Sequence, residues 1–399
     1  MTQNNNIPQG YKKTEIGIIP QEWEVKRLVD LCQNTGDYGI NAPSVPYRED
    51  LPTYLRITDI DGWGKFIETD KVSVDNPNSS QFILREGDIV FARTGATVGK
   101  TYLYDSKDGQ LVFAGFLIRF TPNSNKAIPY YIKASTETPS YWNWVRIISQ
   151  RSGQPGINSV EYGAMKLAVP PLAEQRKIAE ILGVWDEAIE KQSRLIEKLE
   201  FRKRALMQHL LIGRTRLSGF NTPWQKVKLG EIAQIKKGVQ VNKDTLQEYG
   251  KYPTINGGIE PSGYSDNYNT EANTITISEG GNSCGYVNFI TTKFWSGGHC
   301  YTIIPNNNVI KPYLFQQLKH SEPHIMDLRV GSGLPNIQLK TLTQLRCSLP
   351  SLPEQKAIAE VLTSADDEIA THRKKLDALR LQKRGLMQQL LTGKTRVKI

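Results

Sequence analysis

Apolar residues recur with alternating steps of four and three residues along two separate stretches of the chain. In the first stretch these positions are Ile178, Leu182, Trp185, Ile189, Ile196, Leu199, Leu206 and Leu210. This spacing is typical of a coiled-coil seam, and it predicts a long helix over residues 174–212. Gly213 follows at a position where glycine commonly closes a helix.

The same seam returns 180 residues later, which shows that the chain contains an internal repeat. The second set is Ile358, Leu362, Ala365, Ile369, Leu376, Leu379, Leu386 and Leu390, with Gly393 beyond it. Residues 152–217 align with 332–397 without a gap and share 25 identities over 66 positions. We therefore predict four segments: a first domain (1–168), a first helix (169–217), a second domain (218–348) and a second helix (349–399).

Lysines within the two seams indicate how the helices pair. Lys203 and Lys383 occupy equivalent seam positions, so a parallel pair in register would bury two like charges against each other. An antiparallel pair centred near residues 194 and 374 instead places Lys383 opposite Trp185 and Lys203 opposite Ala365. We therefore expect an antiparallel coiled coil. The alternative is that each helix covers only its own domain, which a heptad spacing favours less.

The stretch "RTGATVGKT", which begins at Arg93, has the glycines and the lysine of a phosphate-binding loop. Its spacing is one residue short of the required motif, and the residues that follow are typical of strands and not of a helix. The second repeat has "ITISEGGNSCGYVNF", in which Gly281 and Gly285 again enclose three residues without a following lysine. Both stretches are therefore predicted to be β-hairpins with tight glycine turns.

The net charge of +10 is concentrated in two similar stretches of the chain. Residues 191–217 carry +6 and residues 373–399 carry +8, so the remainder is mildly acidic at −4. A mildly acidic domain is unlike a module that binds DNA phosphates unaided. Any DNA binding would therefore need a partner protein or the two basic stretches.

The sequence contains no sign of secretion, of membrane insertion or of a metal centre. No run of about 18 apolar residues is present, and the N-terminus has no signal-peptide core. Four scattered cysteines, Cys32, Cys284, Cys300 and Cys347, form neither a disulfide framework nor a zinc motif. We expect a reduced, cytoplasmic chain without a membrane partner.

No catalytic or cofactor-binding motif stands out either. The histidines lack any metal-ligand spacing, and His299 beside Cys300 is expected to pack within a strand. The glycine-rich strand end and the Asn/Asp-Pro-Pro-aromatic tetrapeptide of adenosylmethionine-dependent methyltransferases are absent. We therefore expect no catalytic, cofactor or metal site in this chain.

Several motifs, in a fixed order and duplicated, resemble the specificity subunits of type I restriction-modification enzymes. They are the opening "YKKTEIGIIPQEWEVKRL", the block "LREGDIVFARTGATVGK", the domain ends "SGQPGI" and "GSGLPNI", and the helix segments "VPPLAEQRKIAEIL", "LPSLPEQKAIAEVL", "LMQHLLIGRTRL" and "LMQQLLTGKTRV". The resemblance implies a mixed α/β fold, in which two target-recognition domains are joined by two long antiparallel helices with a pseudo-twofold axis.

The same resemblance implies partners and a division of labour. Each domain would read one half of a split, asymmetric target in double-stranded DNA, and the helices would hold the domains at a fixed spacing. Two methyltransferase subunits and further restriction subunits would join this non-catalytic chain. Adenosylmethionine, ATP and Mg would then be bound only by those partner subunits.

Polar and cationic residues on irregular loops are the candidates for contacts with DNA, because arginine suits guanine while asparagine and glutamine suit adenine. They are Arg56, Thr58, Arg93, Thr94, Thr97, Lys100, Arg151 and Gln154 in the first domain, and Asn256, Ser278, Asn282, Ser283, Lys293, Arg329 and Asn336 in the second. Ser152, Gly153 and Pro155 are expected to form a structural turn into the helix. The arginines expected to face a partner or DNA phosphates are Arg204, Arg214, Arg216, Arg384 and Arg396.

A second interpretation belongs to a different class of protein. In it the chain is a coiled-coil scaffold or adaptor, and its two domains recognise protein surfaces.

Overall fold

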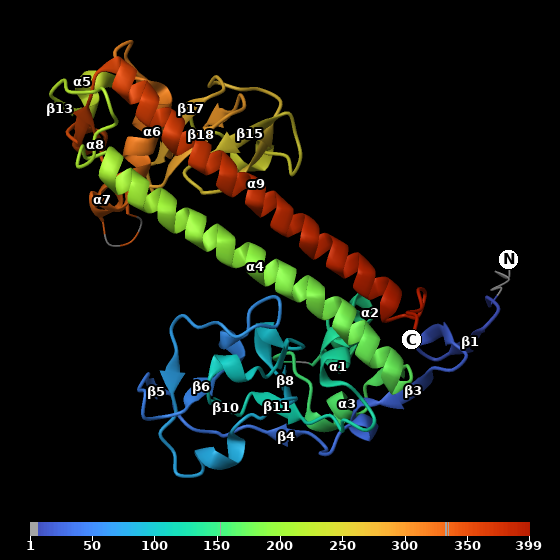
Figure 1. Ribbon diagram of the computed structural model, residues 1–399. Coiled ribbons are helices and arrows are strands. Elements are labelled where there is room, and N and C mark those ends of the chain that lie inside the picture. Colours follow the sequence, from blue (N-terminus) through green and yellow to red (C-terminus); the bar gives the residue numbers. More distant parts are fainter. Residues whose placement is uncertain (1–6, 152, 332, 334) are drawn as a thin grey trace. The chain divides into compact units, whose positions relative to one another are not determined.

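The structure is a computed structural model that describes residues 7–151, 153–331, 333 and 335–399. The chain forms two compact units (Figure 1). The first contains the described residues up to Lys191 together with Leu376–Ile399, and the second contains Gln192–Lys375. Each unit therefore combines one sheet-rich domain with part of both long helices, so the helices are not compact units of their own.

The two long helices are α4 (Leu172–Leu210) and α9 (Leu352–Leu390), shown green and red in Figure 1. Each has 39 residues, and the two begin and end at the same positions of the 180-residue repeat. Gly213 and Gly393 follow with φ angles of +73° and +69°. This left-handed conformation favours glycine and closes the helices, as the sequence predicts.

The domain of the first unit is built on two four-stranded sheets, with strand orders β4-β11-β8-β9 and β10-β6-β7-β5. The strands of the first sheet are β4 (Asp37–Tyr38), β8 (Ile89–Ala92), β9 (Thr101–Leu103) and β11 (Leu117–Phe120). Those of the second are β5 (Val45–Pro46), β6 (Thr53–Leu55), β7 (Val72–Ser73) and β10 (Leu111–Phe113). Two antiparallel pairs complete it: β1 (Tyr11–Thr14) with β2 (Gly17–Pro20), and β3 (Glu24–Arg27) with β12 (Lys166–Val169).

Three short helices, α1 (Pro129–Ser135), α2 (Pro139–Ile148) and α3 (Ser159–Gly163), pack on the first of these sheets. Their apolar side chains share a buried core with Phe91 of β8 and Phe120 of β11. The start of α4 packs elsewhere, because Ile178 and Leu182 are buried with Tyr131 of α1 and with Leu390 of α9.

The domain of the second unit repeats the four-stranded main sheet of this plan, whereas its second sheet has three strands instead of four. Its main sheet has the order β14-β20-β17-β18, and a three-stranded sheet has the order β16-β15-β19. The strands are β14 (Ala233–Lys237), β15 (Tyr252–Ile255), β16 (Gly263–Ser265), β17 (Thr274–Ser278), β18 (Val287–Ile290), β19 (Trp295–Ser296) and β20 (Cys300–Pro305), with β13 (Gln225–Lys228) paired to β21 (Arg346–Leu349). Its helices are α5 (Leu229–Ile232), α6 (Lys311–His320), α7 (Glu322–Asp327) and α8 (Leu339–Thr343).

The glycine stretches are hairpins, as predicted. β8 pairs with β9 and β17 pairs with β18, in both cases antiparallel. The turns have φ angles of +71° at Gly95, +89° at Gly99, +76° at Gly281 and +92° at Gly285. Among the residues that the structure describes, a strand and not a helix directly follows each turn. The geometry of a phosphate-binding loop is therefore not formed.

Candidate nucleic-acid interface

The helix pairing in the first unit is antiparallel. Glu174 near the start of α4 accepts from Arg396, which lies beyond the end of α9, at 2.6 Å. Twelve residues further along α4, Asp186 accepts from Lys383 within α9 at 2.7 Å. The partners therefore run backwards along α9 as α4 runs forwards.

The second unit shows the same direction of pairing. Gln192 donates to the carbonyl of His372 at 3.0 Å, Lys203 donates to Asp366 at 2.5 Å, and beyond the end of α4 Arg216 donates to Glu354 at 2.6 Å. The antiparallel arrangement expected from the two seam lysines is confirmed within each unit.

The partners of the two lysines differ from the sequence prediction. Lys383 contacts the carboxylate of Asp186, and Lys203 contacts the carboxylate of Asp366. From the sequence, Trp185 and Ala365 are expected opposite these lysines. Each of these two residues directly precedes the aspartate that the lysine contacts. A charge-assisted hydrogen bond is stronger than a cation–aromatic contact at a partly solvated site, which explains why each lysine binds the aspartate.

Most of the proposed seam residues are buried. Exposed fractions are 8% or less at Ile178, Leu182, Ile196, Leu199, Leu210, Ile358, Leu362, Ala365, Ile369, Leu376 and Leu390. The others, Trp185, Ile189, Leu206, Leu379 and Leu386, are partly buried.

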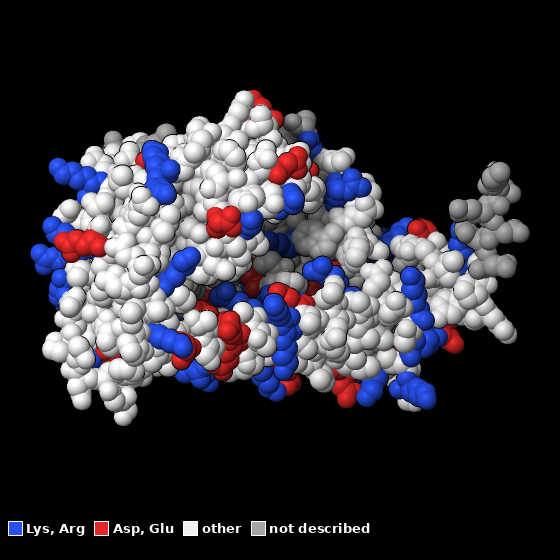
Figure 2. Space-filling model, turned by 90° about the horizontal axis from the view of Figure 1, so that it is seen from above, with Lys and Arg blue, Asp and Glu red and all other residues white. Residues whose placement is uncertain are grey.

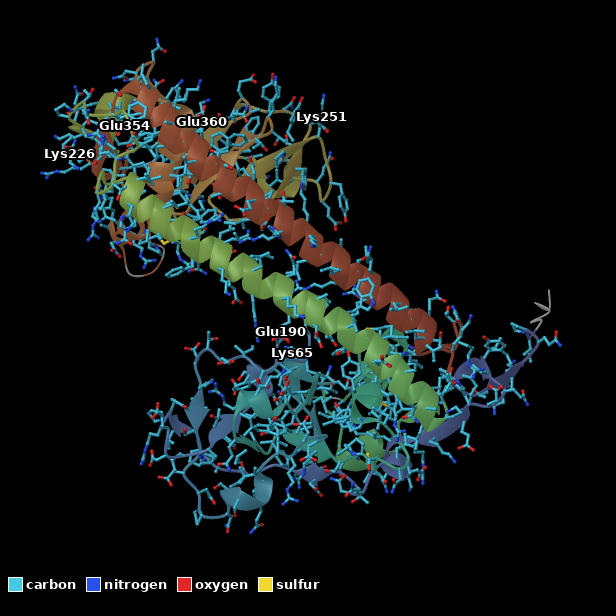
Figure 3. All side chains as sticks on the ribbon, viewed as in Figure 1. Lys65, Glu190, Lys226, Lys251, Glu354 and Glu360 are labelled. Atoms are coloured by element: carbon cyan, nitrogen blue, oxygen red, sulfur yellow. The ribbon has the colours of Figure 1, made fainter. Side chains whose placement is uncertain are left out.

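A buried glutamate at the start of each long helix joins three parts of its unit. Glu174 accepts from the indole N–H of Trp23 at 2.9 Å and from the guanidinium of Arg396 through two nitrogens. Glu354, labelled in Figure 3, accepts from Trp224 at 3.1 Å and in the same two-pronged way from Arg216. Both glutamates have an exposed fraction of 0%. We call these two sites the carboxylate anchors.

The carboxylate anchors correct one expectation. Arg216 and Arg396 were expected to face a partner or DNA phosphates, but each guanidinium is bound to a buried carboxylate of its own unit. Arg396 also pairs with Glu22 at 2.8 Å. These two arginines therefore attach the segment beyond one helix to the start of the other.

The remaining three arginines of that set are exposed. Arg204 lies 6.0 Å from the ring of Phe201, and Arg384 lies 5.9 Å from the ring of Trp63. Contact of Arg204, Arg214 and Arg384 with a partner or with phosphates stays a prediction.

The residue after each glutamate attaches the domain to the helix through the backbone. The side-chain oxygen of Gln175 accepts from the N–H of Ile128 at 2.9 Å, and that of Gln355 accepts from Ile310 at 2.8 Å. Ile128 precedes α1 and Ile310 precedes α6. The two domains are therefore fixed to their helices by the same contacts, although their loops differ.

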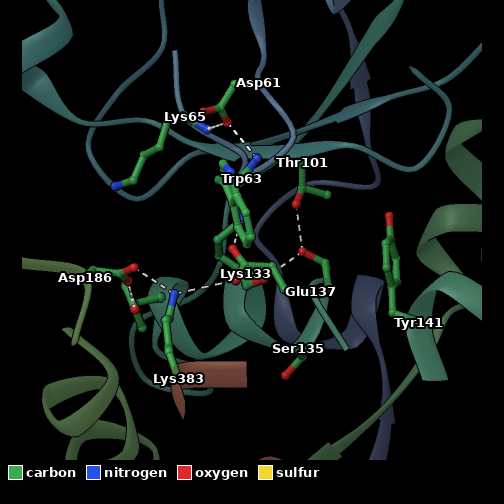
Figure 4. Close-up of polar contacts among 12 residues, drawn as sticks. Asp61, Trp63, Lys65, Thr101, Lys133, Ser135, Glu137, Tyr141, Asp186 and Lys383 are labelled. Atoms are coloured by element: carbon green, nitrogen blue, oxygen red, sulfur yellow. Dashed lines mark hydrogen bonds and ion pairs between the residues drawn. The ribbon is translucent and has the colours of Figure 1, made fainter. Parts of the chain in front are cut away.

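In the first unit a polar network connects α1, α4 and α9 (Figure 4). Lys383 lies 3.6 Å from Glu137, in addition to its contact with Asp186, and Glu137 also pairs with the buried Lys133. A loop of the same domain reaches this place, because the ring of Trp63 lies 4.6 Å from the guanidinium of Arg380. The domain is thus held against both helices by charged and aromatic contacts.

Several DNA-contact candidates of the first domain are engaged within the domain. Arg56 is paired with Asp59 at 2.7 Å and Arg151 with Glu161 at 2.6 Å, while Lys100 donates to the carbonyl of Ile60 at 2.9 Å. The hydroxyls of Thr94 and Thr97 point to backbone carbonyls at 3.4 Å.

The other candidates of the first domain differ in exposure. Thr58 and Gln154 are exposed, although the hydroxyl of Thr58 donates to Asp59 at 3.2 Å. Arg93 is partly buried, and its guanidinium lies 4.8 Å from the ring of Tyr38. The expected turn includes Gly153 and Pro155, which are exposed, whereas Ser152 lies outside the described residues.

In the second domain four candidates also have partners within the domain. Ser278 and Ser283 both donate to the carbonyl of Gly257, Asn256 accepts from the N–H of His299 at 3.1 Å, and Lys293 donates to Tyr268 at 2.8 Å. Asn282, Arg329 and Asn336 are exposed. The role of all these residues in DNA contact stays a prediction.

His299 corrects another expectation. It precedes β20 instead of packing within a strand, and its side chain is 60% exposed beside Glu279. No group of three or more metal-ligating side chains is found among the described residues. No described helix is long and apolar enough to cross a bilayer.

Sequence reasoning missed the pairing partners, although the repeat contained a signal for them. Glu174 and Glu354, Arg216 and Arg396, and Asp186 and Asp366 are all identities between the two copies. Buried or paired polar residues that recur in a diverged repeat are expected where a contact recurs. Trp63 and Glu279 lie outside the aligned region, so no such signal marked them.

The visible face in Figure 2 has Lys and Arg interspersed with Asp and Glu. It shows no broad area of positive charge alone.

Comparison with known proteins identifies the class of this chain. The model of the type I restriction modification DNA specificity domain matches residues 20–200 and again 221–381. A Methanocaldococcus jannaschii protein assigned as the MjaX specificity subunit of a type I restriction enzyme is 28% identical over 426 residues, with 98% of this chain and 97% of the relative covered. The MjaVIII specificity subunit from the same organism is 24% identical, with 95% and 94% covered.

Solved structures agree on the fold. A crystal structure of the S subunit of a type I restriction-modification system from M. genitalium has a TM-score of 0.63 at 18% identity, with 98% of each chain covered. A chain from a study of complex assembly in a type I system has a TM-score of 0.54, with 94% of this chain and 99% of that chain covered.

The chain is therefore a DNA-recognition component of the kind that carries no catalysis itself. It belongs to the family of type I restriction-modification specificity subunits. The scaffold interpretation is not favoured.

Proposed function

We propose that this specificity subunit reads a split, asymmetric target in double-stranded DNA, with one half read by each domain. One observation supports this most directly. The two carboxylate anchors attach both domains to the helices by the same contacts, while the loops of the domains carry different residues. Two domains that are attached in the same way but carry different loops suit a target whose two halves differ and lie at a fixed separation.

The helices would set that separation. Each is a continuous 39-residue element, and an α-helix rises about 1.5 Å per residue. Within each unit the helices are joined by ion pairs as well as by apolar packing, which resists bending and sliding.

Two methyltransferase subunits and restriction subunits are the partners in this proposal. The interspersed surface charge suits a subunit that supplies base contacts while partners supply much of the phosphate contact. Adenosylmethionine, ATP and Mg would be bound by those partners, and the assembly would work on DNA in the cytoplasm.

The test is to co-express the chain with the methyltransferase subunits of its own system and to map modified adenines in the host genome. We expect one recurrent motif with two defined halves and a constant spacer. Modification without any common motif would contradict the proposal, as would DNA binding by the assembled complex that does not weaken as salt rises.

A further inference from the structure

The two domains carry different side chains at one equivalent position, which their backbone hydrogen bonds define. In the first domain Arg93 directly follows β8. Its N–H donates to the carbonyl of Phe116 at 3.0 Å, and its own carbonyl accepts from Ile157 at 2.9 Å.

In the second domain Glu279 directly follows β17. Its N–H donates to the carbonyl of His299 at 2.9 Å, and its carbonyl accepts from Ile337 at 2.8 Å. Ile157 and Ile337 are identities of the sequence repeat. The same two hydrogen bonds therefore place Arg93 and Glu279 at the same point of the fold, where the main sheet meets the turn of its hairpin.

The neighbouring strand provides a third equivalent position. Tyr38 on β4 pairs with Ile118 on β11, and Lys237 on β14 pairs with Tyr301 on β20. Ile118 lies two residues after Phe116, and Tyr301 lies two residues after His299. Tyr38 and Lys237 therefore occupy equivalent positions on the neighbouring strand. The position is thus a triplet: Arg93, Tyr38 and Phe116 in one domain, and Glu279, Lys237 and His299 in the other.

In the first domain the triplet holds the guanidinium of Arg93, a partly buried residue. Arg93 lies 4.8 Å from the ring of Tyr38, whose hydroxyl accepts from the N–H of Ser159 at 3.1 Å. Phe116 beside it is 57% exposed. Within the part of the chain that the structure describes, no carboxylate or carbonyl accepts a hydrogen bond from the Arg93 side chain. Stacking fixes this planar group while its donors stay available, which suits two-pronged recognition.

In the second domain the triplet contains a lysine that is held by a buried glutamate. Glu279 is 9% exposed, and one of its oxygens accepts from Lys237 at 2.5 Å and from Tyr301 at 3.2 Å. Its other oxygen lies 3.4 Å from Nδ1 of His299. The Lys237 side chain is 51% exposed, so Glu279 positions a donor that reaches solvent, and the neighbouring His299 side chain is 60% exposed.

We propose that this triplet is the base-reading position of each domain, and that it specifies a guanine in each half of the target. Arg93 donates to the O6 and N7 acceptors of one guanine, and Lys237, positioned by Glu279, donates to the O6 of another. The inference rests on the proposed function, because it names the bases that the two domains read.

The experiment maps adenine methylation by the assembled methyltransferase complex, with variants of this subunit. Arg93→Ala is expected to relax one guanine requirement in one half of the target by roughly 10- to 100-fold and to leave the other half unchanged. Arg93→Gln is expected to shift the preference at that same position from guanine to adenine, since glutamine pairs with adenine N6 and N7. Arg146→Ala, which removes an exposed arginine of α2, is the matched control and should change no base preference.

For the second domain, Lys237→Ala is expected to relax a guanine requirement in the other half of the target only. Glu279→Gln should relax the same position to a smaller extent, because the amide still accepts from Lys237 without holding its charge. Thermal unfolding of each assembled complex shows whether a variant is folded. A Glu279 role confined to folding would lower the melting temperature without changing the base preference, and this result would overturn its assignment as a positioning residue.

Different results would contradict the base-reading position and the proposed function. Unaltered base preferences in folded Arg93 and Lys237 variants would overturn the inference, and so would an equal loss of affinity for all sequences, which indicates phosphate contact. A wild-type complex that methylates no split target would instead contradict the proposed function, whatever the variants do.

Discussion

At the scale of single residues, the carboxylate anchors explain why two buried glutamates are tolerated. An unpaired buried carboxylate is costly, and here each one receives hydrogen bonds from a tryptophan and from both arms of an arginine. The hydrogen bond and charge of Glu174 raise the pKa of Arg396 above its ordinary range, and Arg396 in turn lowers the pKa of Glu22. Arg396 and Glu22 therefore keep their charges throughout the neutral pH range.

Removing one arginine should therefore destabilise its unit. Arg396→Ala leaves Glu174 with Trp23 alone, and Arg216→Ala leaves Glu354 with Trp224 alone. We expect each to lower the free energy of unfolding of its unit by about 1–3 kcal/mol, as measured by urea unfolding with tryptophan fluorescence. Arg214→Ala is the matched control, because this arginine is exposed, and it should stay within about 0.5 kcal/mol. Equal effects of Arg214→Ala and Arg216→Ala would contradict the anchoring role.

At the scale of elements, two kinds of contact fix the direction of the helix pair. Apolar seam residues give the helices a common face, yet apolar packing alone tolerates either direction. The lysine–aspartate pairs decide between them, because Lys203 meets Asp366 and Lys383 meets Asp186 only when the helices run in opposite directions.

A charge exchange within one pair tests this arrangement. Lys203→Asp places two acids together and should lower the free energy of unfolding of the second unit by about 1–2 kcal/mol. Combining it with Asp366→Lys should restore most of the loss, so a double-mutant cycle should give a coupling of about 1 kcal/mol. Purely additive effects of the two substitutions would show that the residues do not meet. The mixed pair Lys203→Asp with Asp186→Lys provides the control and should show no such restoration.

At the scale of the whole molecule, the length of the helices would determine the length of DNA between the two half-targets. The loop between Arg216 and Trp224 should have no such effect, because both of these residues bind Glu354. Lengthening the helices and lengthening this loop should therefore have opposite consequences.

Insertion of one heptad into each long helix, next to Gln192 and next to His372, preserves both seams and adds about 10 Å to each helix. At about 3.4 Å per base pair, the spacer of the methylated target should grow by about three base pairs while the half-targets stay the same. Insertion of four residues after Gly219 should leave the spacer unchanged. Genome-wide mapping of modified adenines measures both, and a spacer that responds to the loop but not to the helices would refute this account.

Much of the architecture could be predicted from the sequence because the responsible signals are local or repeated. Heptad spacing depends on neighbours three and four residues away, so it revealed α4 and α9 nearly to their ends. The glycine pairs marked both hairpins, because a left-handed backbone favours glycine wherever it occurs. The duplication revealed two domains, and the family motifs within it indicated the function.

The partners of individual charged residues depended on the tertiary structure alone. Arg396 meets Glu174 across 222 positions of the chain, and Lys383 meets Asp186 across 197. Arg93 and Glu279 each stand two residues before the first glycine with a left-handed backbone in their hairpin, but only the structure shows that their side chains meet different partners, a tyrosine ring in one domain and a lysine in the other. The periodicity of a sequence determines which face of an element is apolar, whereas the neighbour of a charge is decided by how distant elements pack.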